Sequence, residues 1–256
     1  MSSAPSLESV RERIARFPHW YHQIEVVPGV TTPGINASGQ VMRVLDQMNL
    51  PKDCRGLSVL DIGARDGFFS FALEQRGAEV LALDYMPPDQ TGYAIASELV
   101  GSKVPYQVAN VYDLTPERFG TFDLVLFLGV LYHLRDPLLA LDHVRSVCKD
   151  QMWIESQVID DGFLNLATGQ MQSLKVVAPN IVSTPIMQFY PRDTLNRDFT
   201  NWWAPNMACL RALLESANFA VLSARLNGGR GLMHCRITND DQVNHFRELD
   251  KGVVSG

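Results

Sequence analysis

The stretch "VLDIGARDGFFSFALEQRGAEVLALDY", residues 59–85, decides the fold. It predicts a strand that ends near Asp61, a glycine turn, a helix that begins near Gly67 and a second strand that ends at Asp84. A strand, a helix and a further strand in succession indicate a crossover connection in a parallel sheet. Gly63 and Gly67 allow the backbone to approach a ligand closely. The stretch therefore predicts an α/β domain with a ligand-binding first turn.

The same alternation continues along the chain. We expect strands at residues 57–63, 78–84, 104–110, 122–129 and 151–159, and helices at 67–77, 91–101, 137–148 and 206–219. Because such crossovers are right-handed, the strands form a doubly wound sheet. Two closing strands, 219–227 and 231–237, joined through the link "NGGRG", predict an antiparallel hairpin at the end of the sheet.

Two segments depart from the alternation. Residues up to about 16 predict an amphipathic helix with Leu7, Val10 and Ile14 on one face, and a turn-rich segment and a helix at 41–48 follow. Residues 160–204 are rich in turn residues, which is typical of a functional loop or a substrate-binding insertion. We expect an N-terminal helical arm and lid (1–55), a main domain (56–238) with that insertion, and a solvated C-terminal tail (239–256).

Composition limits the class of protein and its partners. The four cysteines are scattered without a C-x-x-C pair, which argues against a zinc site and a disulfide framework and fits a reducing cytosol. A signal peptide and a membrane-spanning run are not apparent, so we expect a cytoplasmic protein without a membrane partner. The net charge of -6 disfavours nucleic acid, although a local basic patch is still compatible with RNA binding. Oligomeric state is not specified.

Three ligands compete for the glycine turn. A nicotinamide dinucleotide needs G-x-G-x-x-G, but Ala64, Arg65 and Asp66 stand between the glycines, and Asp66 would repel a pyrophosphate. A P-loop needs Lys followed by Ser or Thr, which is absent after Gly67. The cationic sulfonium and ammonium of S-adenosylmethionine (SAM) tolerate these acids. SAM is therefore favoured, while a purely structural turn capped by Asp66 stays open.

A second informative stretch is "FDLVLFLGVLYHLRDP", residues 122–137. Its apolar start predicts a buried strand, and Asp136 followed by Pro137 predicts a helix N-cap and first helical residue. Tyr132 and His133 then lie on the loop after the strand, at the sheet edge where α/β proteins bind ligands. A structural histidine is the alternative.

Several motifs carry a family resemblance. "VLDIGARDGFFSF", "ALDY", "FDLVLFLGVLYHLRDPLLAL", "IES" and the antiparallel close resemble a class I SAM-dependent methyltransferase. "HWYHQIEVVPGVTTPG", "GVLYHLRDP" and "TNWWAPNMACLRALLESANF" resemble the family typified by the tRNA wobble-uridine (mo5U34) methyltransferase/carboxymethyltransferase. The likeness covers nearly the whole chain. It implies a Rossmann-like, seven-stranded doubly wound sheet with an antiparallel last strand and a SAM site.

The resemblance also implies which residues contact the cofactor. The turn would hold the methionine part, Asp84 the ribose, and later residues the adenine and the donor pocket. The assigned residues are Asp61, Gly63, Ala64, Arg65, Asp66, Gly67, Asp84, Tyr85, Met86, Asn110, Val111, Tyr112, Leu128 and Gly129. The chain departs from the pattern by lacking the usual third glycine. It also has only Arg43 as a cation where the carboxymethyl-transferring enzyme grips an extra carboxylate, which favours ordinary SAM.

Methyl transfer to a hydroxyl requires alignment and removal of a proton. Histidine is the usual base, so His133 is the first catalytic candidate, with Tyr132 bonding acceptor or cofactor. Glu155, near the end of the fifth strand, is a further catalytic candidate whose alternative is a salt bridge or cap. Glu155, Asp160 and Asp161 also offer oxygen ligands to Mg²⁺, so metal use is left open.

The acceptor candidates come from two aromatic segments. We expect the first segment, residues 19–22, to form a lid over the site. In the second segment, residues 201–206, the tryptophans would stack on a sugar or base and the asparagines would bond hydroxyls. Core packing and a helix start at Pro205 are the alternatives. The residues are His19, Tyr21, His22, Asn201, Trp202, Trp203 and Asn206.

The sequence thus predicts a SAM-dependent methyltransferase that O-methylates a hydroxyl of a small molecule, such as a sugar or glycoside. A tRNA wobble-uridine methyltransferase is the alternative. A SAM-binding protein with a decayed acceptor site is disfavoured because Tyr132, His133 and Glu155 are retained.

Overall fold

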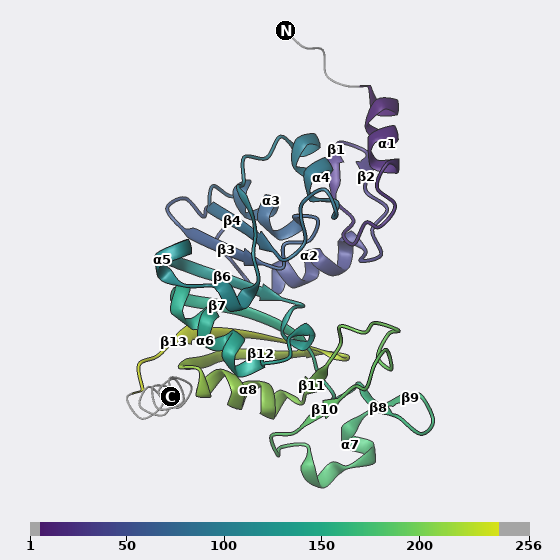
Figure 1. The fold of residues 1–256 in the computed structure, drawn as a ribbon, viewed down its shortest axis with the longest axis vertical. Coiled ribbons are helices and arrows are strands. Elements are labelled where there is room, and N and C mark those ends of the chain that lie inside the picture. Colours follow the sequence, from purple (N-terminus) through teal and green to yellow (C-terminus); the bar gives the residue numbers. More distant parts are fainter. Residues whose placement is uncertain (1–5, 241–256) are drawn as a thin grey trace, which may run out of the picture. The chain divides into compact units, whose positions relative to one another are not determined.

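A central seven-stranded sheet confirms the predicted fold class (Figure 1). The computed structural model describes residues 6–240. The strand order is β12-β13-β7-β6-β3-β4-β5, and the mostly parallel, Rossmann-like sheet closes with antiparallel strands. Its strands are β3 (Ser58–Ile62), β4 (Glu79–Asp84), β5 (Tyr106–Val108), β6 (Phe122–Leu128), β7 (Cys148–Gln157), β12 (Phe219–Asn227) and β13 (Arg230–Ile237). The chain divides into two compact units after Asn110, which are described in turn.

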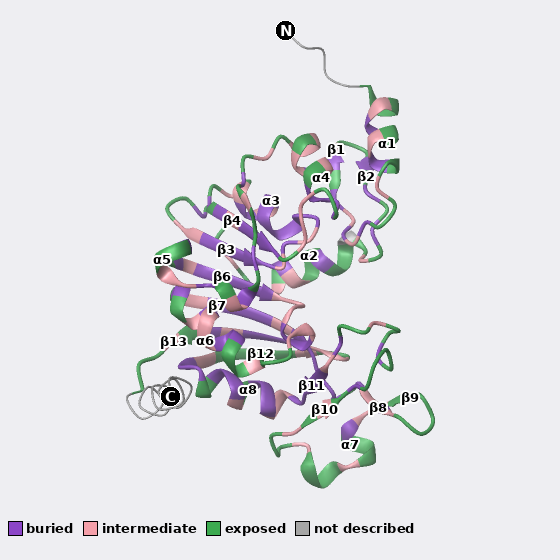
Figure 2. Ribbon diagram, in the orientation of Figure 1, coloured by how far each residue is buried: buried purple, intermediate pink, exposed green. Residues whose placement is uncertain are grey.

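The first unit contains the glycine turn and the segment that precedes it. β3, β4 and β5 are parallel neighbours, with Asp61 opposite Ala82 and Asp84 opposite Val108. The other elements are α1 (Leu7–Ala15), β1 (Glu25–Val27), β2 (Val30–Thr31), α2 (Ser38–Gln47), α3 (Phe68–Glu74) and α4 (Tyr93–Val100). Most residues of β3 and β4 are buried (Figure 2).

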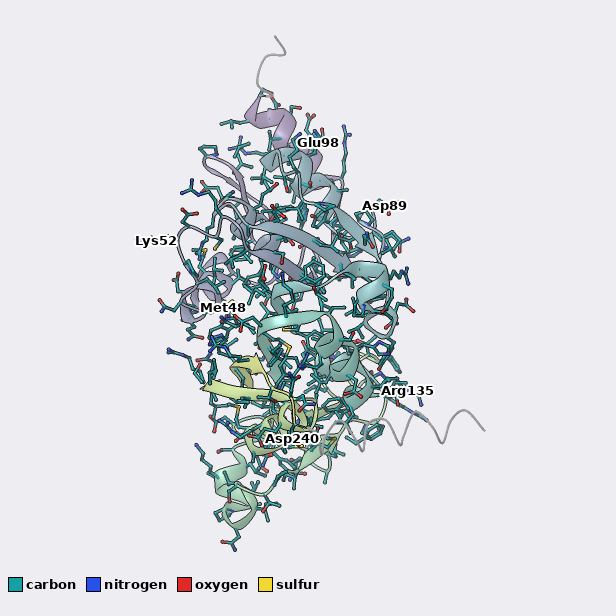
Figure 3. The ribbon with its side chains drawn as sticks, turned by 90° about the vertical axis from the view of Figure 1, so that its left-hand side faces the viewer. Met48, Lys52, Asp89, Glu98, Arg135 and Asp240 are labelled. Carbon is teal, nitrogen blue, oxygen red and sulfur yellow. The ribbon has the colours of Figure 1, made fainter. Side chains whose placement is uncertain are left out.

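Helix α1 is the predicted N-terminal helix. The Ser6 hydroxyl caps it by accepting a hydrogen bond from the Ser9 backbone, and Val10 and Ile14 are buried. Leu7, predicted on the same face, is the first residue of the helix, and its side chain is 50% exposed. Arg13 of α1 forms an ion pair with Glu98 of α4, the helix residue labelled in Figure 3.

The second unit begins at Val111. Its helices are η1 (Val111–Asp113), α5 (Pro116–Phe119), η2 (Leu131–His133), α6 (Pro137–Val147), α7 (Leu174–Val177), η3 (Pro179–Ile181) and α8 (Met207–Ser216). β6 runs parallel to β7, and β13 runs antiparallel to both β7 and β12. Asn227 lies opposite Arg230, which confirms the predicted hairpin. The ends of β6 and β7 therefore meet the beginning of β13.

The insertion is more ordered than its turn-rich sequence indicates. It contains two small antiparallel pairs, β8 (Phe163–Asn165) with β9 (Gln170–Gln172), and β10 (Met187–Phe189) with β11 (Trp203–Pro205). Figure 1 shows these pairs and α7 grouped at one end of the second unit. They share a separate small core of Ile159, Leu164, Leu174, Tyr190, Leu195 and Ala204. This core explains how so irregular a segment holds a fixed shape.

Two local predictions were imprecise. α6 begins at Pro137 as expected, but the Asp136 side chain makes no cap hydrogen bond. α8 begins at Met207 rather than Pro205, because Asn206 supplies the cap and Pro205 belongs to β11. The predicted tail lies outside the described residues from 241 onward. Within residues 6–240, no helix is long and apolar enough to cross a membrane.

Candidate functional site

The glycine turn of the first unit folds back onto the end of β4. The backbone N–H groups of Gly63 and Ala64 both donate to the Leu83 carbonyl, at 2.7 and 3.1 Å. Gly67 has φ +91°, and a side chain there would meet the rings of Phe71 and Tyr93 at 2.4 and 2.9 Å. Glycine is therefore required for both the conformation and the close packing of the turn.

Asp84 lies at the carboxyl end of β4, beside this turn. Its buried carboxylate accepts one backbone N–H from Arg65 and one from Met86, each at 3.0 Å. These bonds fix the orientation of the carboxylate, and each oxygen retains a further lone pair for a ligand. The arrangement fits the hydroxyl pair of a ribose. Tyr85 is 69% exposed next to Asp84, and so is available to flank an adenine.

Asp61 is the buried acid at the end of β3. It accepts a hydrogen bond of 2.6 Å from the Ser70 hydroxyl. Burial raises the pKa of Asp61 to about 6, and the nearby charge of Asp84 adds to this effect, while the Ser70 hydrogen bond opposes it. Two coupled acids therefore lie beside the turn.

Asp66 has a different environment from the one predicted. Its fully buried carboxylate accepts backbone N–H groups from Tyr21, His22 and Gly92 at 2.6, 2.8 and 2.9 Å. It does not cap the helix, because Gly67 occupies the cap position. The contacts observed for Asp66 are thus structural. They fasten the N-terminal segment to the glycine turn and to the start of α4.

This fastening places two acceptor candidates at the cofactor turn. His22 is buried against the rings of Phe68 and Phe69, with centroid distances of 5.9 and 6.1 Å. Burial, and secondarily the charge of Arg65, lower the pKa of His22 to about 3, so the ring is neutral at pH 7. Within the described chain its buried Nδ1 has no hydrogen-bond partner. The Tyr21 ring faces the Arg65 guanidinium at 5.8 Å.

The remaining cofactor candidates are less informative. His19, predicted for the acceptor, is exposed beside Phe17. Asn110 is exposed, and Val111 is buried. The Tyr112 hydroxyl accepts a hydrogen bond from the Asp136 backbone at 3.0 Å.

A polar cluster occupies the end of the parallel strands of the second unit. Arg230 donates to both oxygens of Glu155, to the Gln157 side chain at 3.2 Å and to the Tyr132 hydroxyl at 3.3 Å. Its guanidinium also lies 4.8 Å from the Tyr132 ring. Burial lowers the pKa of Arg230, but Glu155 outweighs that effect and raises it. The cluster is therefore held by a charged, multiply bonded arginine.

The cluster changes the interpretation of Glu155. Both oxygens of Glu155 accept hydrogen bonds from the Arg230 guanidinium, so the carboxylate is engaged in a bidentate ion pair. Its salt bridge, one of the alternatives open from sequence, is the contact that the structure shows. Gly129 lies beside it with φ +73°, and its backbone N–H donates to the Glu155 carbonyl at 2.8 Å.

Arg230 was missed from the sequence because it lies in the hairpin link. The register of the hairpin places Arg230 opposite Gln157, two residues beyond Glu155. The signal that could have found it is the predicted hairpin itself, since an antiparallel strand next to the fifth strand must bring its first residues to that strand's end.

His133 lies at the end of η2, close to the cluster in sequence and space. Its ring packs on Tyr132 with a centroid distance of 4.2 Å. Its Nδ1 lies 2.8 Å from the Thr200 hydroxyl and 3.3 Å from the Thr200 carbonyl. The insertion therefore reaches the predicted catalytic histidine.

The four acceptor candidates of the insertion separate into two kinds. Trp203 is buried, and its ring N–H donates to the Leu134 carbonyl at 2.8 Å. Asn206 follows the insertion and caps α8 by accepting from the Cys209 backbone N–H. Its amide group also donates to the Val182 and Thr184 carbonyls and accepts from the Ile186 backbone N–H. Both act in packing, because their polar atoms are bonded within the protein. Trp202 is half-buried, with the Arg135 guanidinium 5.0 Å from its ring. Asn201 is buried and donates to the Leu195 carbonyl.

The carboxylates considered for magnesium do not form a suitable donor set. Glu155 is bonded to Arg230, and Asp160 accepts from the Met207 backbone at 2.8 Å, with its pKa raised by burial. Asp161 accepts from the Ser173 hydroxyl at 3.1 Å. Residues 6–240 contain no group of three or more histidine, cysteine, aspartate or glutamate side chains able to hold a metal ion. These carboxylates therefore do not fit a magnesium site.

Comparison with known proteins places the chain in a family. Residues 36–224 match the family described as "Methyltransferase domain". The chain belongs to this family. Over 95 residues it is 37% identical to a ubiquinone biosynthesis O-methyltransferase of Xanthomonas campestris pv. campestris, and over 94 residues 36% identical to one of Xanthomonas oryzae pv. oryzae. These matches cover 37% and 36% of this chain, and the chain spans 39% of the length of each relative.

Solved structures of other proteins share the fold. The N-terminal domain of EvdMO1, crystallised in the presence of SAH and D-fucose, is 19% identical with a TM-score of 0.63, and the match covers 94% of this chain and 100% of that one. The SAH-bound 1,6-didemethyltoxoflavin-N1-methyltransferase of Burkholderia thailandensis is 19% identical with a TM-score of 0.51, covering 77% and 76%. None of these names denotes a tRNA-modifying enzyme, so the narrower wobble-uridine resemblance is not supported.

Proposed function

We propose that this methyltransferase-family chain transfers a methyl group from SAM to a hydroxyl of a small molecule. The observation that carries the O-methylation is His133, which is the last residue of η2 and whose Nδ1 lies 2.8 Å from the Thr200 hydroxyl. Imidazole is the side chain best suited to accept a hydroxyl proton near neutral pH. The relatives named O-methyltransferases support the same reaction class.

The donor contacts in this proposal come from the glycine turn and from Asp84. SAM supplies an electrophilic methyl group when bound. Asp84 would accept hydrogen bonds from the ribose hydroxyls, because its carboxylate is already oriented by two backbone N–H groups. The backbone of the 63–67 turn would receive the amino-acid end. Tyr21 and His22, which close over this turn through Asp66, would exclude water from it.

The acceptor contacts in this proposal come from His133 and Tyr132. The acceptor oxygen would take the methyl group, and the electron pair of the broken sulfur–carbon bond would remain on sulfur. The hydroxyl proton would move to His133. Tyr132, whose hydroxyl accepts a hydrogen bond from Arg230, can donate its own hydrogen to an oxygen of the acceptor. Arg230 and Glu155 hold Tyr132 in place.

A sugar or glycoside is the acceptor class that we favour within this proposal. Trp202 is half-buried, and Arg135 lies over its ring. An aromatic face beside charged groups suits the mixed apolar and hydroxyl surface of a sugar ring. Aromatic hydroxyl compounds form the competing class of acceptor, because the similar sequences are named ubiquinone biosynthesis O-methyltransferases.

Labelled SAM provides the test. The protein would be incubated with methyl-labelled SAM and a cell extract, and label would be counted separately in RNA and in small molecules, followed by product identification. Label in small molecules supports the proposal, and the product distinguishes sugar from aromatic acceptors. Label in tRNA, or no transfer above a protein-free blank, overturns it.

A variant pair then tests the base. We expect His133→Ala to retain SAM affinity, measured by calorimetry, and to lose turnover by about 10²–10⁴-fold, the usual contribution of a positioned base. The matched control is His143→Ala, since His143 lies on α6 and bonds the Leu114 carbonyl. Normal turnover of His133→Ala would show that it is not the base, and lost SAM binding would assign it to the donor site.

A further inference from the structure

A short hydrogen-bonded chain leads from His133 into the insertion. The His133 Nδ1 lies 2.8 Å from the Thr200 hydroxyl oxygen. That hydroxyl donates to Asp198 Oδ1 at 2.6 Å, and the Thr200 backbone N–H donates to the same oxygen at 2.8 Å. Asp198 and Thr200 were not singled out in the sequence, because "RDFTN" resembles an ordinary polar turn.

The chemistry of this chain fixes which histidine nitrogen carries the proton. A carboxylate only accepts hydrogen bonds, so the single Thr200 hydroxyl hydrogen is committed to Asp198. The Thr200 oxygen must then accept from His133. The Thr200 carbonyl, 3.3 Å from the same Nδ1, also only accepts. Both contacts therefore require a proton on Nδ1, which leaves the lone pair of the neutral ring on Nε2.

The insertion is held against the histidine on both sides of this contact. The Trp202 backbone N–H donates to the Tyr132 carbonyl at 3.0 Å, and the Trp203 ring N–H donates to the Leu134 carbonyl at 2.8 Å. These bonds bracket His133, so three successive residues of the histidine loop are bonded by three residues of the insertion. Such bracketing restricts the rotation of the loop and keeps Thr200 opposite Nδ1.

We propose that Asp198 and Thr200 are positioning residues that hold His133 as the Nδ1–H tautomer, so that Nε2 receives the acceptor proton. The inference rests on the proposed function, in which His133 is the base. During transfer the hydroxyl proton joins Nε2 and the ring becomes a cation, while the Asp198 charge, reached through Thr200, favours that cation. The proton passes to water after the product leaves.

The first test reads the tautomer directly and does not depend on activity. In protein with isotope-labelled histidine, NMR shifts of the ring carbons and nitrogens distinguish Nδ1–H from Nε2–H, and His133→Ala identifies the signal. We expect Nδ1–H in the wild type and in Thr200→Ser, which keeps the hydroxyl. Thr200→Val, which replaces it with a methyl group, should shift the population toward Nε2–H. An Nε2–H wild type, or an unchanged Thr200→Val, overturns the inference.

The second test is turnover at saturating SAM with the acceptor found by labelling. We expect Thr200→Val and Asp198→Ala to reduce turnover by about 10–100-fold, part of the contribution of a positioned base. Thr200→Ser should restore most of it, because it keeps the hydroxyl. Asp198→Asn should restore only part of it, because the amide keeps an accepting oxygen but not the charge that favours the cation. SAM affinity should be unchanged. Asp193→Asn and Thr194→Val, exposed residues of the same insertion, are the matched controls.

The results separate failure of the inference from failure of the proposed function. If His133→Ala is fully active, His133 is not the base, whatever tautomer NMR shows. If His133→Ala is inactive while Thr200→Val and Asp198→Ala turn over normally, the base assignment stands and the positioning role is wrong. Loss in Thr200→Val without rescue by Thr200→Ser would indicate a purely steric effect and would also overturn the inference.

Discussion

Replacing Asp66 with alanine should destabilise the first unit strongly. The change leaves three backbone N–H groups, those of Tyr21, His22 and Gly92, without their acceptor. Each buried donor left unsatisfied costs about 1–3 kcal/mol. The donors of His22 and Gly92 lie in buried residues, whereas Tyr21 is half-buried and its N–H can find water. We therefore expect the free energy of unfolding to fall by about 2–6 kcal/mol.

Urea unfolding followed by circular dichroism measures this change, and limited trypsin digestion locates it. We expect earlier cleavage of Asp66→Ala at the arginines of α1, because Asp66 binds the segment that follows this helix. Asp89→Ala is the matched control, since Asp89 is exposed in the same unit (Figure 3). A loss below about 1 kcal/mol would refute the reasoning, as it would mean that the three donors are satisfied without Asp66.

Three further predictions concern pH and packing. Because burial raises the pKa of Asp61 to about 6, the folded state binds its proton more tightly than the unfolded state does. The unfolding free energy relative to Asp61→Asn should therefore decrease by about 2 kcal/mol as pH rises from 4 to 7. Urea titrations at several pH values would show this decrease, and parallel curves for the two proteins would contradict it. His22 behaves oppositely, because its pKa of about 3 lies below the value in the unfolded chain. The unfolding free energy relative to His22→Leu should therefore decrease by about 3 kcal/mol as pH falls from 6.5 to 4. Equal acid sensitivity of the two proteins would disprove the assignment. Trp203→Ala should lower the unfolding free energy by about 3–5 kcal/mol, because Trp203 is buried. Trp202 is half-buried, so Trp202→Ala should mainly raise the KM for the acceptor. Equal destabilisation by the two substitutions would show that Trp202 is also a packing residue.

The parallel strands and main helices could be predicted because their signals are local. The apolar runs of β3, β4, β6 and β7 carry their own burial pattern, and Gly67 marks the start of α3. The small strands β8 to β11 could not be predicted. Each of them is only three residues long, which is too short for a period-2 pattern to stand out. They form because the side chains around Tyr190 pack into a small core. That packing joins residues far apart in the sequence.

The candidate site was predictable in part for the same reason. Asp84 and His133 follow strands, and a strand end is visible in the sequence, so the expectation that they lie at a sheet edge agrees with the structure. The roles of Asp66 and Glu155 were not visible, because their hydrogen-bond partners lie 44 and 75 residues away, at His22 and Arg230. A carboxylate in a sequence does not reveal which donors will surround it.

The sequence by itself determined the alternation of strands and helices, the glycine turn, the antiparallel closing hairpin and the loop that carries Tyr132 and His133. These features depend on hydrophobic periodicity and on backbone preferences, which act over a few residues. Only the tertiary structure decided that the Asp66 carboxylate binds the backbone of the N-terminal segment. The same holds for the ion pair between Arg230 and Glu155 and for the hydrogen bond between Thr200 and His133. Hydrogen bonds and ion pairs depend on distances of about 3 Å between residues brought together by folding, so the chain must be folded before they can be assigned.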